Sequence, residues 1–322
     1  SEVYILGYLW NKEFFQKNFP CSLRPQGKEI VRNWLYFTML KSFLLFGKAP
    51  FRNVWIHMHV VDEEGKKMSK SAGNVIDPLD AINMFGGEAF RIWSGLEGNI
   101  TKGDIRCSFE RIKGTSKFLT KLWNVARFVS CFLQVREDYE PAPLDRMILG
   151  KLNELVEECR SGYEEMNAFR AATAIRTFTW NIFADHYIEA AKSRAYNRDG
   201  VFDFKLQKGA WHTLHKCLET ILKLLAPICP FITEAIWLEL YSKEGIHLQG
   251  FPQENPGWET NLVKLLPKFV EFNNAIWQHK KCNGLALSQE LTTTIYAPIE
   301  LEPLVEDIKT MHRIRSLSFG KP

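Results

Sequence analysis

Two lysines stand three residues apart in a short run of small residues, in the segment KMSKS at 67–71 that continues with Ala-Gly-Asn at 72–74. Lysine ammonium groups act as mobile point charges on phosphate oxygens, and small residues let the backbone close over a ligand. The segment therefore predicts a loop that stabilises negative charge developing on a leaving polyphosphate. By composition alone, a solvated basic turn explains the same residues.

The elements around this segment predict how it is positioned. Residues 54–62 (VWIHMHVVD) have the β-branched and aromatic content of a buried strand, and a helix is expected before it, from about Lys28 to Phe46. The residues DEEG supply a turn, and Asp77-Pro78 is typical of a helix start, with Asp as the cap and Pro at the first helical position. The helix start adds a dipole that favours a bound anion.

The rest of the chain is mainly helical. From residue 108 to about 237, apolar residues recur at spacings of three and four, which predicts an antiparallel helix bundle with one break at 136–145. After 250–258 the pattern changes to a helix at 261–281, a β-branched run at 291–301, a helical stretch at 304–310 and the short run RIRSLSF. The expected fold class is mainly α with an α/β part.

Bulk properties exclude several function classes. A net charge of +4 is too mild to indicate nucleic-acid binding by itself, so any RNA site must be local. Seven cysteines without a CxxC pair argue against a zinc site and a disulfide framework, and no metal site is predicted. The apolar runs fall short of the roughly 20 residues of a membrane span, so we expect a cytoplasmic protein without a membrane partner. The start resembles neither a signal peptide nor a natural beginning, and is expected to be a cut inside a longer chain.

The string KMSKS, in this strand and helix context, is the signature of class I aminoacyl-tRNA synthetases. The resemblance covers nearly the whole chain. Residues 22–40 (SLRPQGKEIVRNWLYFTML) resemble the segment that enters the active site of valyl enzymes, and RPQG is similar to the archaeal type. Further blocks similar to this family are GNVIDPLDAI (73–82), GDIRCSFERI (103–112), FLTKLWNVARFV (118–129), FADHYIEAAK (183–192) and LAPICPFITEAIW (225–237).

The resemblance implies a set of ATP contacts. Gly27 and Glu29 match an element that approaches the ATP ribose, where a carboxylate can accept hydrogen bonds from two hydroxyls. Without the resemblance, Gly27 is interpreted as a turn glycine and Glu29 as an acid at a helix start. Ile30 and Trp34 are implied in the amino-acid pocket, or are ordinary core. Related enzymes often keep a Gly beside the adenine where this chain has Met58. The implied ATP-binding residues are Gly27, Glu29, His57, Met58, Lys67, Met68, Ser69, Lys70 and Ser71.

The sequence pattern gives neither His57 nor His59 of WIHMHV a partner acid or a metal-ligand spacing, so packing or surface exposure explains each as well as a ligand role does. The other signature of the class, His-Ile-Gly-His or a near variant, occurs nowhere in the 322 residues. The chain is therefore expected to hold half of a catalytic site and to be inactive by itself.

Candidate RNA contacts lie on two helices. Lys113, Lys117 and Lys121 recur four apart on one face, continued by Asn124, and suit backbone phosphate or form a solubilising stripe. The helix at 177–197 is expected to bury Trp180, Phe183, Ala184 and Tyr187 or Ile188, and to expose three residues near its end. The family reads the anticodon with such polar and aromatic side chains, which makes the further candidates Phe128, Glu189, Lys192 and Arg194; Phe128 equally fits the core, and Glu189 an intrahelical pair.

The predicted organisation has three parts. Residues 1–106 would be the second half of a Rossmann-type catalytic domain with its stem-contact region, 107–255 the anticodon-binding helical bundle, and 256–322 a small α/β appendage. The implied parent reaction is activation of valine by ATP with Mg²⁺ and transfer to tRNA(Val), by a monomer in which Lys67 and Lys70 are catalytic. The alternatives are an isoleucyl or leucyl enzyme, a tRNA-binding protein that has lost catalysis, and a generic helical interaction module.

Overall fold

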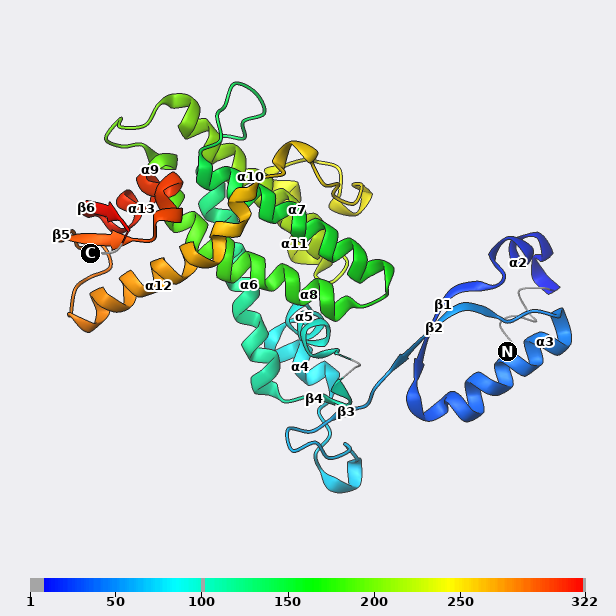
Figure 1. The fold of residues 1–322 in the computed structure, drawn as a ribbon. Helices are drawn as coiled ribbons and strands as arrows, with labels where there is room; N and C mark the ends of the chain where they lie inside the picture. Colours follow the sequence, from blue (N-terminus) through cyan, green and yellow to red (C-terminus); the bar gives the residue numbers. More distant parts are fainter. Residues whose placement is uncertain (1–8, 100–101, 321–322) are drawn as a thin grey trace. The chain divides into compact units, whose positions relative to one another are not determined.

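The computed structural model describes residues 9–99 and 102–320, which form two compact units. Of these, residues 9–81, 97–99 and 102–111 make up the first unit, and residues 82–96 and 112–320 make up the second. The start at 1–8, where the sequence predicts no signal peptide, lies outside the described residues. Figure 1 shows the element order along the chain.

The first unit contains two parallel strands joined by a helical crossover. Helix α2 (Lys12–Asn18) precedes β1 (Cys21–Gly27), which pairs with β2 (Phe51–His57) in a register running from Cys21 opposite Phe51 to Gly27 opposite His57. Parallel neighbours need such a crossover because each strand must return to the same end. Both strands therefore finish at one edge of the sheet, at Gly27 and His57.

The crossover confirms the helix expected from Lys28 to Phe46, although its first turns are irregular. A 3₁₀ turn, η1 (Lys28–Ile30), and a π-type turn, η2 (Val31–Leu35), precede the regular helix α3 (Tyr36–Phe46). The helix ends at Gly47, whose φ of 66° is left-handed and whose N–H is donated to Phe43 O.

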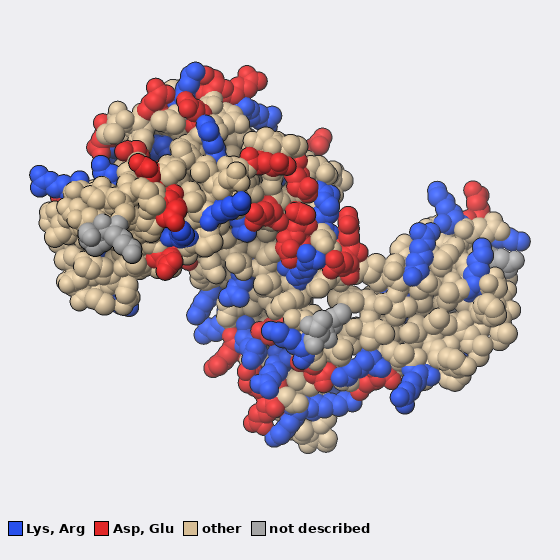
Figure 2. Space-filling model, viewed as in Figure 1, with Lys and Arg blue, Asp and Glu red and all other residues tan. Residues whose placement is uncertain are grey.

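Helix α3 exposes an unusual amount of apolar surface. Phe43, Leu44 and Leu45 are 64%, 74% and 58% exposed within the structure. Much of the visible face of the segment around α2 and α3 carries neither acidic nor basic residues (Figure 2). An apolar surface of this kind is typical of an interaction surface.

The strand expected at 54–62 is present but is neither continuous nor buried. It is divided into β2 and the short β3 (Val60–Val61), with Met58 and His59 between them, and most of β2 is exposed or half-buried. The prediction of a buried strand was therefore wrong, because its composition reports the apolar character of the strand and not what covers it. Strand β3 pairs in parallel with β4 (Ile105–Arg106).

The helix start predicted at Asp77-Pro78 is confirmed. Helix α4 (Pro78–Phe85) begins with Pro78, and Asp77 Oδ1 accepts a hydrogen bond from Leu79 N at 2.8 Å. Between β3 and α4 lies the segment KMSKS, with only the short turn η3 (Lys70–Ala72) inside it. The predicted order of strand, loop and helix is thus present.

The second unit is the predicted helix bundle with the C-terminal elements packed onto it. Its helical elements are α5 (Gly87–Glu97), α6 (Phe109–Val129), α7 (Pro143–Glu164), α8 (Ala168–Arg176), the π-type η5 (Thr177–Tyr187), α9 (Ile188–Tyr196), α10 (Phe204–Leu225), α11 (Pro230–Leu240) and α12 (Leu266–Cys282). Short 3₁₀ turns connect them: η6 (Ile246–Leu248), η7 (Pro256–Trp258) and η8 (Asn261–Leu265). Among the helices of the described residues, none is both long enough and apolar enough to cross a membrane.

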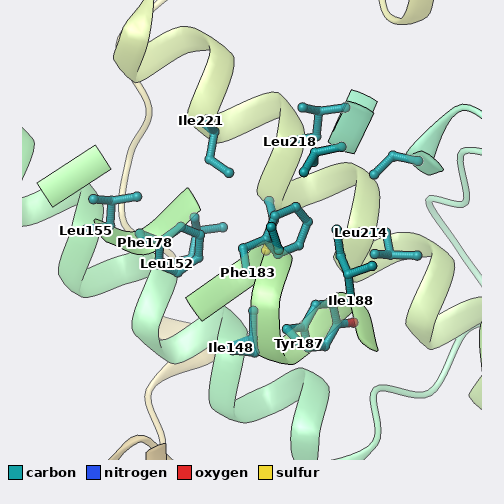
Figure 3. Close-up of a cluster of buried hydrophobic side chains, with 14 of the residues drawn as sticks. Ile148, Leu152, Leu155, Phe178, Phe183, Tyr187, Ile188, Leu214, Leu218 and Ile221 are labelled. Atoms are coloured by element: carbon teal, nitrogen blue, oxygen red, sulfur yellow. The ribbon is translucent and has the colours of Figure 1, made fainter. Parts of the chain in front are cut away.

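The core of the bundle forms between α7, η5 with α9, and α10. Figure 3 shows side chains from these three segments meeting, with Leu152 from α7, Phe183 from η5 and Leu218 from α10 among them. All three are fully buried. Apolar residues recur three and four apart along these helices, as the sequence predicted. Residues at these spacings lie on one face of a helix, which is the face that packs into the core.

The C-terminal residues form a small parallel pair that shares this core. Strand β5 (Leu291–Ala297) pairs with β6 (Ile314–Phe319), and η9 (Ile299–Leu304) and α13 (Val305–His312) connect them. Helix α5 also packs on the bundle, since Ile92 is buried there and Arg91 Nε donates to Ile228 O at 2.7 Å. Helix α5 and the C-terminal elements thus belong to the second compact unit, and the predicted division at 106 and 255 stays a prediction.

Candidate active site

Three titratable side chains meet just beyond the carboxyl ends of β1 and β2. Glu29 follows β1, His59 follows β2, and Lys67 comes from the KMSKS segment. Glu29 Oε1 accepts a hydrogen bond from Lys67 Nζ at 2.7 Å and lies 3.0 Å from His59 Nε2. The hydrogen bond from Lys67 is the main cause that lowers the pKa of Glu29, and the charge of His59 adds to it. Glu29 is therefore held as a carboxylate.

A second acid fixes the two strand ends. Asp104 Oδ1 accepts from Lys28 Nζ at 2.5 Å and from His59 N at 3.1 Å, so it links the residue after β1 to the residues after β2. The hydrogen bond from Lys28 lowers the pKa of Asp104. Because His59 O also accepts from Ile105 N at 2.7 Å, the backbone at His59 is held on both sides.

The KMSKS loop is tied at its base by Asp62 and Asn74. Asp62 Oδ2 accepts from Asn74 Nδ2 at 2.7 Å, and Asn74 Oδ1 accepts from Ser69 N at 3.0 Å. Asp62 Oδ1 accepts from Lys66 N at 2.7 Å. Above this base, Ser69 Oγ accepts from Ala72 N at 3.2 Å. The loop is therefore ordered by its own polar groups.

The two lysines of the loop are both presented to solvent. The Lys67 side chain is 71% exposed, and Lys70 is also an exposed residue. Met68 and Ser69 are half-buried, whereas Ser71 is exposed with its hydroxyl 3.2 Å from Ser69 Oγ. The loop thus places two cations and two hydroxyl groups around one turn, an arrangement that suits phosphate oxygens.

The structure brings part of the predicted nucleotide site together. Gly27 lies at the end of β1, and a Cβ built on it would be 3.5 Å from the His57 ring, so the backbone runs close to that side chain. His57 Nδ1 lies 3.2 Å from Met58 O, and Met58 is half-buried. Gly27, Glu29 and Lys67 therefore share one edge of the sheet.

The predicted amino-acid pocket residues lie on the irregular first turns of the crossover. Ile30 is 40% exposed and Trp34 is 37% exposed. The guanidinium of Arg24 lies 3.9 Å from the centre of the Trp34 ring, a cation–π contact. Their role in a pocket stays a prediction.

Four polar residues at this edge were missed as site residues: His59, Asp62, Asn74 and Asp104. The sequence pattern identifies no partner acid for His59, but the parallel register of β1 and β2 brings Glu29 beside it. Within the described residues, no group of three or more His, Cys, Asp and Glu side chains is arranged to hold a metal ion. Cys107, Cys131, Cys159, Cys217, Cys229 and Cys282 are free thiols.

The lysine face predicted on α6 is mostly exposed. Lys113, Lys117 and Asn124 are exposed, whereas Lys121 is half-buried. Lys121 Nζ donates to Asp185 Oδ1 at 2.6 Å and lies 5.5 Å from the centre of the Trp180 ring. The outer part of this face is therefore available for an anion, while Lys121 is already paired.

On α9, the exposed Glu189 pairs with Lys192 at 2.5 Å, and Lys192 Nζ lies 5.8 Å from the centre of the half-buried Phe128 ring. Beside them is a cavity of about 520 Å³. It was not anticipated from the sequence, and the residues lining it include Lys192, Tyr196, Asn197, Arg198, Phe202 and Arg313. Arg198 lies 5.1 Å from the centre of the Tyr196 ring. Cations and an aromatic ring in one cavity suit an unstacked base with its phosphate.

The prediction that Arg194 is exposed for RNA contact was wrong. Arg194 is 1% exposed and donates to Asp145 Oδ2 at 2.6 Å and to Asp307 Oδ1 at 3.2 Å. A buried guanidinium needs such partners, because an unpaired buried charge is very costly. Arg194 therefore joins α9 to α7 and α13, and its side chain does not face solvent.

Comparisons with known proteins match both units. Residues 3–106 match a family profile described as tRNA synthetases class I (I, L, M and V), and residues 145–295 match the anticodon-binding domain of tRNA ligase. The chain belongs to the class I aminoacyl-tRNA synthetase family. This confirms the resemblance carried by the KMSKS segment.

Curated relatives of the chain include valine–tRNA ligases of archaea. The chain is 37% identical to those of Pyrobaculum aerophilum and Aeropyrum pernix, with 100% of this chain and 40% of each relative covered. It is 35% identical to that of Methanothermobacter thermautotrophicus, with 97% of this chain and 36% of the relative covered. The chain thus spans well under half the length of these relatives.

A solved structure has the same fold over most of the chain. It is the crystal structure of a LeuRS-tRNA-LeuAMS ternary complex from Agrobacterium radiobacter, with a TM-score of 0.60 and 21% sequence identity. The match covers 81% of this chain and 32% of that chain. It confirms the expected fold class, mainly α with an α/β part.

Proposed function

We propose that this chain is the KMSKS-bearing and tRNA-binding portion of a valine–tRNA ligase. The observation that carries the proposal is the contact between Lys67 and Glu29 at the carboxyl edge of β1 and β2. In open α/β sheets, ligands bind beyond the carboxyl ends of parallel strands. The valine specificity is supported by the names of the curated relatives.

In the proposed first step, a carboxylate oxygen of valine attacks the α-phosphorus of ATP. A bond forms between that oxygen and phosphorus, and the bond to the bridging oxygen breaks. Pyrophosphate leaves with the electron pair of the broken bond. Lys67 and Lys70 would stabilise the negative charge that grows on this leaving group, since fixed cations are worth most where charge develops.

Glu29 would accept hydrogen bonds from the ribose hydroxyls of the nucleotide. Its present partners are Lys67 and His59, and the side chains of Glu29 and Lys67 are 49% and 71% exposed. Exposed ion pairs are only weakly stabilising, so ATP can replace this contact by offering ribose to the carboxylate and phosphate to the ammonium group. Because Gly27 has no side chain, the nucleotide could approach the backbone closely at this position.

The side chains of the KMSKS loop fit phosphate better than a metal ion. The loop offers ammonium and hydroxyl groups, and the carboxylate beside it, Glu29, is already paired with Lys67 and His59. Mg²⁺ would therefore arrive with ATP and be held by oxygens of its phosphates.

For the second step, the bundle would bind tRNA(Val) through α6, α9 and the cavity beside them. Lys113 and Lys117 would contact backbone phosphate, and the cavity lined by Tyr196 and Arg198 would take an unstacked base. The family profile of an anticodon-binding domain over 145–295 supports this assignment.

We infer that the remaining half of the catalytic site comes from sequence beyond these residues, so the isolated chain would not aminoacylate. The exposed apolar side chains of α3 support this inference, because they need a covering surface. We also propose that the protein is a monomer located in the cytoplasm.

The test is ATP–pyrophosphate exchange by the full-length protein with valine, isoleucine or leucine as the substrate. Exchange that depends on valine is the expected result. Exchange with isoleucine or leucine alone would assign a related enzyme, and tRNA binding without any exchange would assign a non-catalytic tRNA-binding protein.

A further inference from the structure

The KMSKS loop is closed by a side-chain pair that joins its two ends. Asp62 stands before the loop and Asn74 after it, and Asp62 Oδ2 accepts from Asn74 Nδ2 at 2.7 Å. The pair connects residues that are twelve apart in the sequence. A loop bounded by such a contact has fewer conformations than one held only at its flanking strand and helix.

Both residues of the pair also hold loop backbone. The other oxygen of Asp62 accepts from Lys66 N at 2.7 Å and from Glu64 N at 3.1 Å. The oxygen of Asn74 accepts from Ser69 N at 3.0 Å. The hydrogen bond from Asn74 is the main cause that lowers the pKa of Asp62, so these bonds are made to a carboxylate and are charge-assisted.

The points that the pair holds lie on both sides of Lys67. Lys66 N is fixed by Asp62, and Ser69 N, immediately before Lys70, is fixed by Asn74. The backbone carrying the two lysines is thus anchored at the residue before each of them. Charged groups contribute most to catalysis when their position is set before the reaction.

We propose that Asp62 and Asn74 are positioning residues that hold the loop backbone so that Lys67 and Lys70 face the leaving pyrophosphate together. The inference rests on the proposed function and deepens it, because neither residue is itself proposed to touch the nucleotide. Their effect should therefore be confined to adenylate formation, the step in which pyrophosphate leaves.

The chemistry of the pair allows an exchange of the two side chains as a test. With Asp62→Asn alone, the new amide meets the amide of Asn74, and turning either amide costs another hydrogen bond in the set. With Asn74→Asp alone, two carboxylates face each other. In the double variant Asp62→Asn/Asn74→Asp, an amide again donates to a carboxylate, and the oxygens that accept from Lys66 N and Ser69 N are retained. The long contact from Asn74 Nδ2 to Lys67 O, at 3.4 Å, is lost.

The experiment uses the full-length enzyme and two measurements on the same variants. The first is valine-dependent ATP–pyrophosphate exchange, and the second is hydrogen exchange of the amides of Lys66 and Ser69. Each single substitution should slow pyrophosphate exchange roughly tenfold, the scale of one lost charge-assisted hydrogen bond. Each should also speed amide exchange in the loop, and the double variant should restore most of both losses, because it lacks only the long contact to Lys67 O.

Two controls separate positioning from a general loss of structure. Transfer of valine from preformed adenylate to tRNA should be unchanged in every variant, since no pyrophosphate leaves in that step. The matched control is Glu64→Gln, which removes one acid of the same turn whose carboxylate contacts the Lys66 side chain at 2.6 Å. It should leave both measurements at the level of the unaltered enzyme.

The outcomes distinguish the inference from the proposed function. If the unaltered enzyme supports valine-dependent exchange but the single variants match it, or the double variant is no better than the singles, the positioning role is overturned. If the singles slow adenylate transfer as much as adenylate formation, the role is overturned as well. An unaltered enzyme without any exchange would instead refute the proposed function.

Discussion

Lys67 and Glu29 stand 38 residues apart in the sequence, yet the Lys67 ammonium group donates to Glu29 Oε1 at 2.7 Å. The contact brings the KMSKS loop to the edge where β1 and β2 end. Had the loop packed elsewhere, a shared nucleotide site would have been impossible. Because the ion pair is exposed to solvent, it is only weakly stabilising, and we expect a bound nucleotide to replace the contact between Lys67 and Glu29.

Removing the ammonium group of Lys70 should impair adenylate formation. In the full-length enzyme, Lys70→Ala should lower the rate by roughly 10²–10³-fold, about 2.7 to 4 kcal/mol, the usual scale for one preorganised group at developing charge. Pyrophosphate exchange measures the change directly. The control is Lys66→Ala, since Lys66 pairs with Glu64 and lies just outside the signature. Equal rates for Lys70→Ala and the unaltered enzyme would remove the assigned role.

Replacing Glu29 by Gln should weaken ATP binding. The substitution keeps the size of the side chain but leaves one acceptor oxygen where a carboxylate had two, and it removes the charge that pairs with Lys67. We expect the KM for ATP to rise roughly tenfold, with a smaller change in the KM for valine. Steady-state exchange kinetics at varied ATP measure the effect. An equal rise in both constants would indicate a general disturbance of the site and contradict the ribose contact.

The parts of the site that could be predicted from the sequence are those set by local residue order. The KMSKS string, the capping Asp77 and the following proline are neighbours along the chain, and the structure has them as expected. The helices of the bundle follow from the spacing of apolar residues, which local periodicity reports. Such features need no knowledge of distant partners.

The missed features depend on contacts between distant residues. Glu29 meets His59 because β1 and β2 pair in parallel, and no local pattern gives that register. Arg194 seemed exposed beside Lys192 at the end of a helix, but its partners Asp145 and Asp307 are 49 and 113 residues away. A charged residue near a helix end therefore does not reveal whether it faces solvent.

Removing the Arg194 guanidinium should destabilise the bundle. Arg194→Met would leave the carboxyl groups of Asp145 and Asp307 buried without their cation, which typically costs about 3 to 5 kcal/mol. Urea unfolding followed by circular dichroism measures the loss. The control is Arg198→Met, since Arg198 is exposed and contacts only the Tyr196 ring among the aromatic side chains of the described residues. Comparable stability of the two variants would show that the buried network contributes little.

The stability of the C-terminal elements should fall as pH rises between about 4 and 6. Burial is the main cause that raises the pKa of Asp307 from 3.8 to about 6, and the nearby acids Asp145 and Glu306 raise it further. The Arg194 guanidinium, which Asp145 shares, opposes the shift. A carboxyl group whose pKa is raised by folding binds its proton more tightly in the folded state. Its contribution is thus greatest below the unfolded pKa and is lost as pH rises through about 6.

Asp307→Asn tests this dependence, because the amide cannot ionise. A pKa raised from 3.8 to about 6 corresponds to roughly 3 kcal/mol across the interval. The difference in unfolding free energy between Asp307→Asn and the unaltered protein should therefore change with pH by up to that amount. Denaturant unfolding at pH 4, 5, 6 and 7 gives the curve. A difference that is the same at every pH would show that Asp307 does not titrate in this range.

The lysine face of α6 should contribute to RNA binding through charge alone. Lys113 and Lys117 are exposed, and each phosphate that they neutralise releases condensed counterions. The double variant Lys113→Ala/Lys117→Ala should therefore reduce the slope of log affinity against log salt concentration by roughly 1.5 to 2, with little change in selectivity among tRNAs. Titration of tRNA(Val) at several salt concentrations measures the slope. Lys264→Ala is the control, since this lysine is exposed on η8 and outside the proposed interface. If Lys264→Ala changes the slope as much as the double variant does, the phosphate contacts are not specific to Lys113 and Lys117 and lie elsewhere on the bundle.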